Sequence, residues 1–405
     1  MSHTAESSPT HSPSIAYLVW LAGISAALHI WKLPPSLPIL QSQLGLNLVE
    51  SGFLLSLVQL GGMTLGLLVG LVAEKVGLRR CVLAGLALLT VSSVLGAVFS
   101  TKEALLLFRA LEGCGMLMVT MPAPPLIRRL VPPSYLSRLM GVWGCYIPVG
   151  TVIILLGGSW LLTVSTWQFL WELLGLVTLL MAGAVWRWIP PDSTRRHCSQ
   201  DARPAAASSN SAWGMVRDTL SCLDVWLVAL SFGAYSGQWI AVIGFLPSIY
   251  VAAGISGTAA GMMTAVVAGS NALGNLAGGR SLHRGVKPRT LLCTGFSAMA
   301  VTAFVAFGLD VPASVKFVAV ILFSGIGGLI PSTLFLLAIQ LAPSLRTTTT
   351  SVGWVQQLSA LGQFGGPPLV AWVATLTGGW QWTWLATGSS ALAGIAMAFV
   401  LGRRR

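Results

Sequence analysis

The sequence has 405 residues, of which 55% are hydrophobic and only 8% are charged. Soluble domains carry about 25% charged residues, so this composition excludes an ordinary soluble fold and indicates a polytopic membrane protein. The formal net charge of +12 would suit a nucleic-acid partner only if the basic residues gathered on one exposed surface.

Apolar runs long enough to span a bilayer, about 20 residues each, recur along the chain. They predict an all-α fold of twelve transmembrane helices in two pseudo-symmetric six-helix bundles. The first six runs lie near 16–40, 50–73, 81–100, 104–127, 137–162 and 167–189. The second six lie near 224–251, 257–281, 290–309, 314–342, 347–376 and 380–402.

Polar segments divide these runs into domains. Residues 1–14 are rich in Ser, Thr, His and Pro, and are expected to form a disordered tail without the basic start of a signal peptide. Residues 190–219 contain Pro, Ala, Ser and Arg and predict a flexible linker. The predicted bundles are therefore 15–189 and 220–405.

The basic residues are distributed unevenly between the two sides of the predicted membrane. All 23 lysines and arginines fall in alternate loops and the C-terminal tail, except Lys32, Lys102, Arg109 and Lys316. This asymmetry follows the positive-inside rule and places both termini in the cytoplasm. The excess of positive charge is thus explained by the orientation of the chain in the membrane, and no nucleic-acid partner is expected.

A short charged stretch, 70–80, separates the second apolar run from the third. It reads Gly-Leu-Val-Ala-Glu-Lys-Val-Gly-Leu-Arg-Arg, and Gly77 can adopt a positive φ in a tight hairpin. The spacing resembles the signature loop between helices two and three of the major facilitator superfamily, apart from Glu74 for the commoner Asp and Leu78 for a base. The resemblance implies a conformational gate, with Gly70, Glu74, Lys75, Gly77, Arg79, Arg80 and, in the second half, Arg284 as its expected residues.

A degenerate copy of this loop occurs in the second half. Gly279 lies 209 residues after Gly70, Gly285 matches Gly77 when one residue fewer is allowed, and His283 stands where the first copy has its acid. Echoed loops of this kind are typical of a duplicated transporter. Glu74 is expected to hold the two halves together in the outward-facing state, so that Glu74→Ala should shift the population inward.

Helix four is expected to carry two charges within the membrane. Arg109 and Glu112 share a helix face, and the run from Arg109 to Gly115 resembles the superfamily's Arg-x-x-Gln-Gly-x-Gly motif with Glu in place of Gln. An unpaired Arg at this depth costs at least about 2.5–3.5 kcal/mol, so it should face the bundle interior or its neighbouring acid. Two interpretations stay open: a structural ion pair, or a pair that couples transport to proton movement.

In this superfamily helices one, four, seven and ten line the solute cavity. Helix one offers a stripe of Ser25, His29 and Lys32, helix seven an aromatic and amide group, and helix ten a Gly/Pro-rich break over 324–333. An excess of cations there favours an anionic solute. The expected solute-binding residues are His29, Lys32, Arg109, Tyr235, Gln238, Trp239 and Ser332.

Each of these candidates has a structural alternative. Lys32 can extend to the membrane surface, with its charged end in water. His29 can be a hydrogen-bonded packing residue, and Tyr235 and Trp239 can fill space with a satisfied polar tip.

Parts of the second half resemble the cyanate-transporter-like branch of the superfamily, with a small-anion theme shared by the nitrate branch. The resemblance rests on 241–250, 325–331 and 357–368. That branch's Asn-x-Arg-Pro is absent from helix one, where Ala27 takes the Arg position and Lys32 is a stand-in about one turn away. Substrate identity does not carry over.

The sequence therefore predicts a secondary active transporter that moves a small polar or anionic solute by alternating access, coupled to protons. The alternative is efflux of an amphipathic drug or metabolite by proton antiport, which a partial helix-five antiporter signature over 141–150 disfavours. No phosphate-binding loop, catalytic cluster, metal site or cofactor motif is recognised, so no enzyme is expected. We expect a monomer in the cell inner membrane whose partners are the solute, protons and the lipid bilayer.

Overall fold

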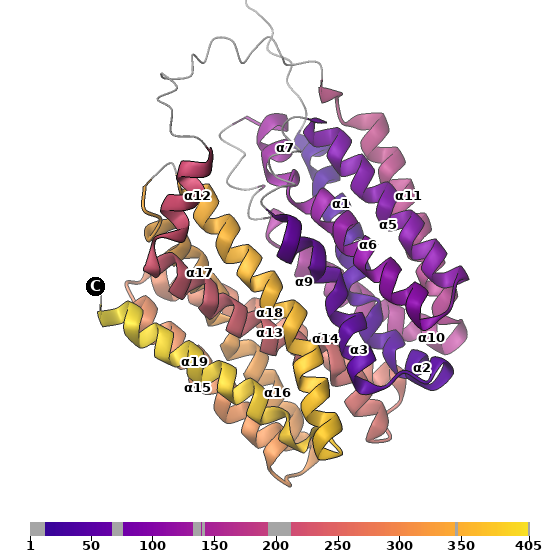
Figure 1. The fold of residues 1–405 in the computed structure, drawn as a ribbon. Helices are drawn as coiled ribbons and strands as arrows, with labels where there is room; N and C mark the ends of the chain where they lie inside the picture. Colours follow the sequence, from indigo (N-terminus) through magenta and orange to yellow (C-terminus); the bar gives the residue numbers. More distant parts are fainter. Residues whose placement is uncertain are drawn as a thin grey trace, which may run out of the picture.

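The computed structural model describes residues 13–66, 76–132, 139, 142–192, 212–344 and 347–403. Every regular element within these ranges is a helix. Figure 1 shows two groups of helices side by side, one from the first half of the chain in indigo to magenta and one from the second half in red to yellow.

The first group is made of helices that partly join end to end. α1 with α2, α6 with α7, and α9 with α10 each form one membrane-length stretch. The elements are α1 (Pro13–Trp31), α2 (Leu33–Leu44), α3 (Leu48–Ser56), η1 (Leu57–Gln59), α5 (Leu78–Val98), α6 (Lys102–Thr120), α7 (Ala123–Leu130), α9 (Tyr146–Ile153), the π-helical turn η2 (Ile154–Gly158), α10 (Ser159–Val164) and α11 (Trp167–Trp188).

The second group begins after the linker with a short helix and continues with longer ones. α16 and α17 form one stretch that is interrupted at Gly328. The elements are α12 (Ala212–Leu220), α13 (Leu223–Ala252), α14 (Gly257–His283), α15 (Pro288–Ala303), η4 (Phe304–Gly308), α16 (Ala313–Gly327), α17 (Leu329–Gln340), α18 (Thr348–Thr377), η6 (Trp380–Trp382) and α19 (Thr383–Arg403).

Ten stretches within the described ranges are long and apolar enough to cross a membrane. Two of the twelve expected, α14 and α18, reach 27 and 30 residues but are rich in Gly, Thr, Asn or Gln. These same helices pack across the two groups, α18 against α3 and α14 against α9 and α10. A helix covered by protein on one side needs less apolar surface than one surrounded by lipid.

The two groups meet away from the linker. We call the side where α11 ends and α12 begins the linker face; toward it the two groups diverge in Figure 1. On the opposite side Gly52 lets α3 approach α18, because a Cβ there would lie 2.8 Å from the Cα of Pro368. Further along, Gln357 Nε2 donates to the carbonyl of Met63 at 2.7 Å. The halves are therefore in close contact from the side opposite the linker face as far as the level of Met63 and Gln357.

Candidate solute and proton site

Four ionisable side chains meet inside the first group of helices. His29 and Lys32 come from the α1–α2 stretch, Arg109 and Glu112 from α6, and all four are fully buried. Glu112 lies at the centre: its Oε1 accepts from Lys32 Nζ at 2.5 Å and its Oε2 from Arg109 Nη1 at 2.7 Å. One carboxylate thus serves two cations, and we call these four residues the ion cluster.

Backbone carbonyls accept three further hydrogen bonds from the Arg109 guanidinium. Nε donates to the carbonyl of Leu54 at 3.2 Å, and Nη1 and Nη2 donate to those of His29 and Ile30 at 2.6 and 3.4 Å. Pro34 explains why the Ile30 carbonyl is open, since proline has no N–H to give the residue four positions earlier. The proline-rich sequence of helix one therefore helps build the Arg109 pocket.

Lys32 is held inside the helices by three partners. Besides Glu112, its Nζ donates to Ser93 Oγ at 2.8 Å and lies 3.7 Å from the centre of the Trp171 ring. Ser93 in turn donates to the Trp171 carbonyl at 2.8 Å. The alternative in which Lys32 extends to the membrane surface is therefore wrong in this structure.

His29 has one bonded and one unbonded ring nitrogen. Its Nε2 lies 2.8 Å from Thr178 Oγ1, and that hydroxyl donates its own proton to the Leu174 carbonyl at 2.9 Å. We therefore assign the Nε2 proton to His29 from this network. Nδ1 forms no hydrogen bond and lies 3.6 Å from Glu112 Oε1, so it is an open position for a proton.

Charge balance decides which member of the ion cluster can change its protonation. With Lys32, Arg109 and Glu112 ionised, one positive charge is unmatched. Protonating Glu112 would leave two buried cations without a counter-charge, and removing one partner of a buried pair typically costs about 3–5 kcal/mol. Releasing a proton from Lys32 instead leaves the Arg109–Glu112 pair balanced.

A second polar network, without charges, lies in the second group of helices. Asn271 Nδ2 lies 2.8 Å from both Tyr235 Oη and the Ser324 carbonyl, to each of which it donates. Trp239 Nε1 donates to Ser324 Oγ at 3.0 Å, and Asn275 Nδ2 to Asn271 Oδ1 at 3.0 Å. We call these five residues the amide network.

The two polar centres are linked by an aromatic contact between the halves. Trp31 precedes Lys32 and meets Trp239 edge to face, with ring centres 5.6 Å apart. Trp31 is 3% exposed and Trp239 half-buried. Trp31, next to Lys32 in the sequence, therefore contacts the amide network through Trp239.

Two of the expected solute-binding residues lie elsewhere. Gln238 faces α18 and α19, where it lines a cavity of about 380 Å³ with Gly362 and Thr387. Ser332 donates to the carbonyl of Leu329 at 3.2 Å and faces α14 at Gly278. A helix turns by about 100° per residue, so Gln238 lies about 60° around α13 from Tyr235 and about 100° from Trp239, which is enough to direct it to α18 and α19 instead of α14 and α16.

Several residues of the site were missed from the sequence. Ser93, Trp171 and Thr178 belong to α5 and α11, outside the helices expected to line the cavity, and Asn271 belongs to α14. The only available signal was a polar side chain within an apolar run, and many such hydroxyls simply bond the carbonyl four residues back, as Thr264 does.

The expected gate is only partly described. Gly70, Glu74 and Lys75 lie outside the described residues. Gly77 has φ of 113° and Gly285, its expected counterpart, has φ of 83°, which confirms that both loops use a left-handed glycine to turn. Arg284 caps the end of α14 and is exposed.

An unexpected acid organises the described part of the gate. Both oxygens of Asp192 accept backbone N–H bonds at the start of α5, from Arg79 at 3.2 Å and Arg80 at 3.1 Å. Arg129 of α7 adds a salt bridge at 2.8 Å, and the Arg79 guanidinium donates to the carbonyl of Trp186. Asp192 thereby ties the start of the linker to α5 and α7.

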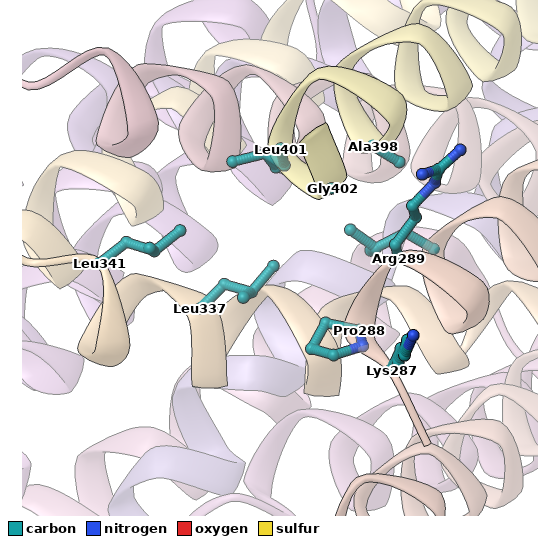
Figure 2. Close-up of a pocket in the computed structure, with 9 residues that line it drawn as sticks. Lys287, Pro288, Arg289, Leu337, Leu341, Ala398, Leu401 and Gly402 are labelled. Atoms are coloured by element: carbon teal, nitrogen blue, oxygen red, sulfur yellow. The ribbon is translucent and has the colours of Figure 1, made fainter. Parts of the chain in front are cut away.

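A second cavity lies at the linker face of the second group, well away from both polar centres. Its volume is about 350 Å³, and it opens between α15, α17 and α19 (Figure 2). None of the expected solute-binding residues lines it.

Comparison with known families decides the identity of the fold. A family model described as Major Facilitator Superfamily matches residues 19–364. The chain belongs to the major facilitator superfamily. This major facilitator protein is therefore a multi-pass membrane protein from a superfamily of transporters rather than enzymes.

Curated relatives match the major facilitator chain over parts only. An uncharacterized MFS-type transporter of Mycobacterium tuberculosis is 30% identical over 135 residues, which are 33% of this chain and 20% of that protein. The 2-nitroimidazole transporter of Escherichia coli is 26% identical over 234 residues, or 56% of this chain and 55% of that protein. The chain thus matches about a fifth to about half the length of these relatives.

Solved structures show the same fold at low sequence identity. A bacterial homolog of the human lysosomal transporter Spinster, crystallised in an inward-facing and occupied conformation, has a TM-score of 0.81 at 16% identity and 98% coverage of both chains. A D-xylose-proton symporter has a TM-score of 0.74 at 16% identity and 96% coverage of both chains. These likenesses concern the fold alone.

Proposed function

We propose that this protein is a secondary active transporter that moves a small polar or anionic solute, coupled to protons, by alternating access of its two halves. The proposed units are the tail 1–14, the bundles 15–189 and 220–405, and the linker 190–219. The observation that carries the proposal is the ion cluster, in which Glu112 is shared by Lys32 and Arg109 without access to water. A buried ionisable group within a membrane protein is by default a functional candidate.

Proton coupling is assigned to the Glu112 Oε1 side of the cluster. Lys32 Nζ lies 2.5 Å from this oxygen and donates a hydrogen bond to it, and His29 Nδ1 offers an open position 3.6 Å from it. If the Lys32 proton leaves the protein, the ion cluster becomes neutral. If that proton moves to His29 instead, the net charge of the cluster does not change. Arginine side chains stay protonated in proteins, so Arg109 is the fixed positive charge that pairs with Glu112.

Solute contact is assigned to the Trp31–Trp239 contact between the halves and to the amide network that adjoins it in the second half. The unmatched positive charge of the ion cluster favours an anion nearby, although Lys32 and Arg109 are too buried to touch it in this state. Trp31, Trp239 and the amide network supply rings and hydrogen-bonding groups there. Movement of the halves would be needed for His29, Gln238 or Ser332 to join them.

The orientation proposed from the positive-inside rule makes the linker face cytoplasmic, in the cell inner membrane. The contacts between halves at the opposite face then correspond to an inward-facing state. Glu74 remains the proposed latch of the outward-facing state, and cysteine accessibility in Glu74→Ala tests it.

A second candidate function is transport of a flat heteroaromatic compound by proton antiport. It is favoured by the relative whose name gives 2-nitroimidazole and by the Trp31–Trp239 pair, whose rings can pack on a flat solute. The two candidates differ in the charge of the solute and in the direction of proton movement.

Proteoliposomes with an internal pH dye distinguish them. Addition of small anions, including cyanate and nitrate, should acidify the lumen during uptake by the first function, whereas 2-nitroimidazole should alkalinise it by the second. Lys32→Gln should abolish the pH change and Lys102→Gln, a matched change at a partly exposed pair with Glu50, should keep it. Failure of both solute classes to move protons or to enter as labelled compounds would overturn the proposal.

A further inference from the structure

The cavity in Figure 2 combines apolar walls with a basic rim. Leu337 of α17 and Leu341, the residue after that helix, form one side, and Leu401 of α19 forms another, while Lys287 and Arg289 lie where α15 begins. Its volume of about 350 Å³ suits one or two lipid chain ends rather than a whole folded partner. The complete lining is Lys287, Pro288, Arg289, Leu292, Leu337, Leu341, Ala398, Leu401 and Gly402.

The two cations at this rim lack internal counter-charges. Within the described part of the chain, the salt bridges all lie in the first half, and neither Lys287 nor Arg289 joins one. Arg289 is instead held over the ring of Phe399, with its guanidinium carbon 4.2 Å from the ring centre. Gly402 leaves room for its stem, since a Cβ there would lie 3.1 Å from Arg289 Cγ.

The cavity lies at the level of a membrane surface. Membrane-length stretches begin at Pro288 and end at Gln340 and Arg403, so that three of them terminate around it. The Leu side chains therefore face the outer part of the hydrocarbon layer, and the cations face the headgroups. Basic pockets between helix ends at such a level attract anionic headgroups.

We propose that this cavity binds an anionic phospholipid, with its phosphate between Lys287 and Arg289 and an acyl chain along Leu337, Leu341 and Leu401. Charge complementarity identifies the headgroup, and the apolar walls require a lipid rather than a soluble phosphate. The lipid would join α15, α17 and α19 at the linker face, where α17 continues the interrupted helix that bears Ser324 of the amide network.

The test is a binding titration of the purified full chain in neutral detergent by native mass spectrometry. Phosphatidylglycerol and phosphatidylcholine with identical acyl chains are compared, and inorganic phosphate is added as a competitor. The wild type should bind phosphatidylglycerol more tightly than phosphatidylcholine, and inorganic phosphate should not displace the bound phosphatidylglycerol. Because each surface cation contributes about 1 kcal/mol and each 1.4 kcal/mol is tenfold, the double variant Lys287→Gln/Arg289→Gln should bind it about 30-fold more weakly.

Matched variants separate this site from general electrostatics and from misfolding. Arg217→Gln/Lys316→Gln removes the same charge from residues outside the cavity and should keep the affinity. Leu341→Trp keeps both cations but fills the apolar wall, and should also weaken phosphatidylglycerol binding. Equal binding of both lipids, displacement by inorganic phosphate, equal losses in the two double variants, or full affinity in Leu341→Trp would each overturn the proposal. The comparison of the two lipids on the wild type needs no variant, so it tests the proposal even if a variant fails to fold. None of these measurements depends on transport.

Discussion

The two halves of this molecule place different chemistry at equivalent positions. His29, Trp171 and Thr178 in the first half are separated from Gln238, Trp380 and Thr387 in the second by the same chain distance that separates Gly70 from Gly279. In the first half this region is filled by the ion cluster. In the second, Gln238 and Thr387 line a cavity of about 380 Å³.

Packing follows this difference in chemistry. Both halves bring helices together at glycines, as Gly85 and Gly115 do in the first half, and as α13 and α18 do in the second, where a Cβ on Gly237 would lie 2.6 Å from the Gly362 carbonyl. Among the described residues, the first half adds fully buried charges to these contacts. Buried charges fix positions because each must keep its partners, whereas glycine contacts hold two backbones by dispersion alone. We infer that the first half senses protons and that the second supplies uncharged groups to the solute.

The largest effect is expected from Glu112→Gln. The amide leaves Lys32 and Arg109 buried without a counter-charge, which should lower the free energy of unfolding by about 3–5 kcal/mol. Denaturant unfolding in detergent measures this loss. Glu50→Gln, which removes a partly exposed carboxylate bonded to Lys102, is the control and should cost about 0–1 kcal/mol. Equal losses of unfolding free energy in the two variants would mean that the buried ion cluster stabilises the protein no more than the exposed pair does.

Lys32→Gln should separate proton coupling from stability. Because Arg109 and Glu112 remain balanced, the protein should fold, but solute accumulation driven by a pH gradient should fall by about 5–150-fold, the usual range of a coupling free energy. Exchange of labelled solute without a gradient should persist. A parallel loss of exchange would instead make Lys32 a structural residue only.

Gly237→Ala tests the glycine packing of the second half. The added methyl group meets the Gly362 carbonyl and should destabilise the protein by about 1–3 kcal/mol, as overpacking does. Gly365→Ala on α18, where a Cβ has open space, should have little effect in the same thermal melt. A tolerated Gly237→Ala would show that α13 and α18 are less constrained than proposed.

Asn271→Ala tests the amide network of the second half. It removes hydrogen bonds to Tyr235 and to the Ser324 carbonyl, each worth about 0.5–1.5 kcal/mol net. The apparent affinity for solute should weaken without any change in the pH dependence of transport. An altered pH profile would place proton coupling in both halves and remove the asymmetry.

Local sequence determined much of the fold. Apolar run length predicted several helices to within a residue, as for α11 (Trp167–Trp188) against the expected 167–189 and α13 (Leu223–Ala252) against 224–251. The spacing of Arg109 and Glu112 predicted their pairing because residues three apart share a helix face. The glycines at 77 and 285 predicted the two tight turns. Each of these inferences depends on neighbours within one or two helical turns.

Only the tertiary structure decided which helices met and at what rotation. It brought Lys32 to Glu112 across 80 residues and to Ser93 across 61, and it directed Gln238 to the cavity lined by α18 and α19. It also placed Asp192 at the start of α5, where its carboxylate accepts a backbone hydrogen bond from Arg79, more than a hundred residues away in the sequence. A helix turns by about 100° per residue, so a small difference in its rotation decides whether a polar side chain faces a partner, the other half or lipid. That rotation is set by the packing of all the helices together.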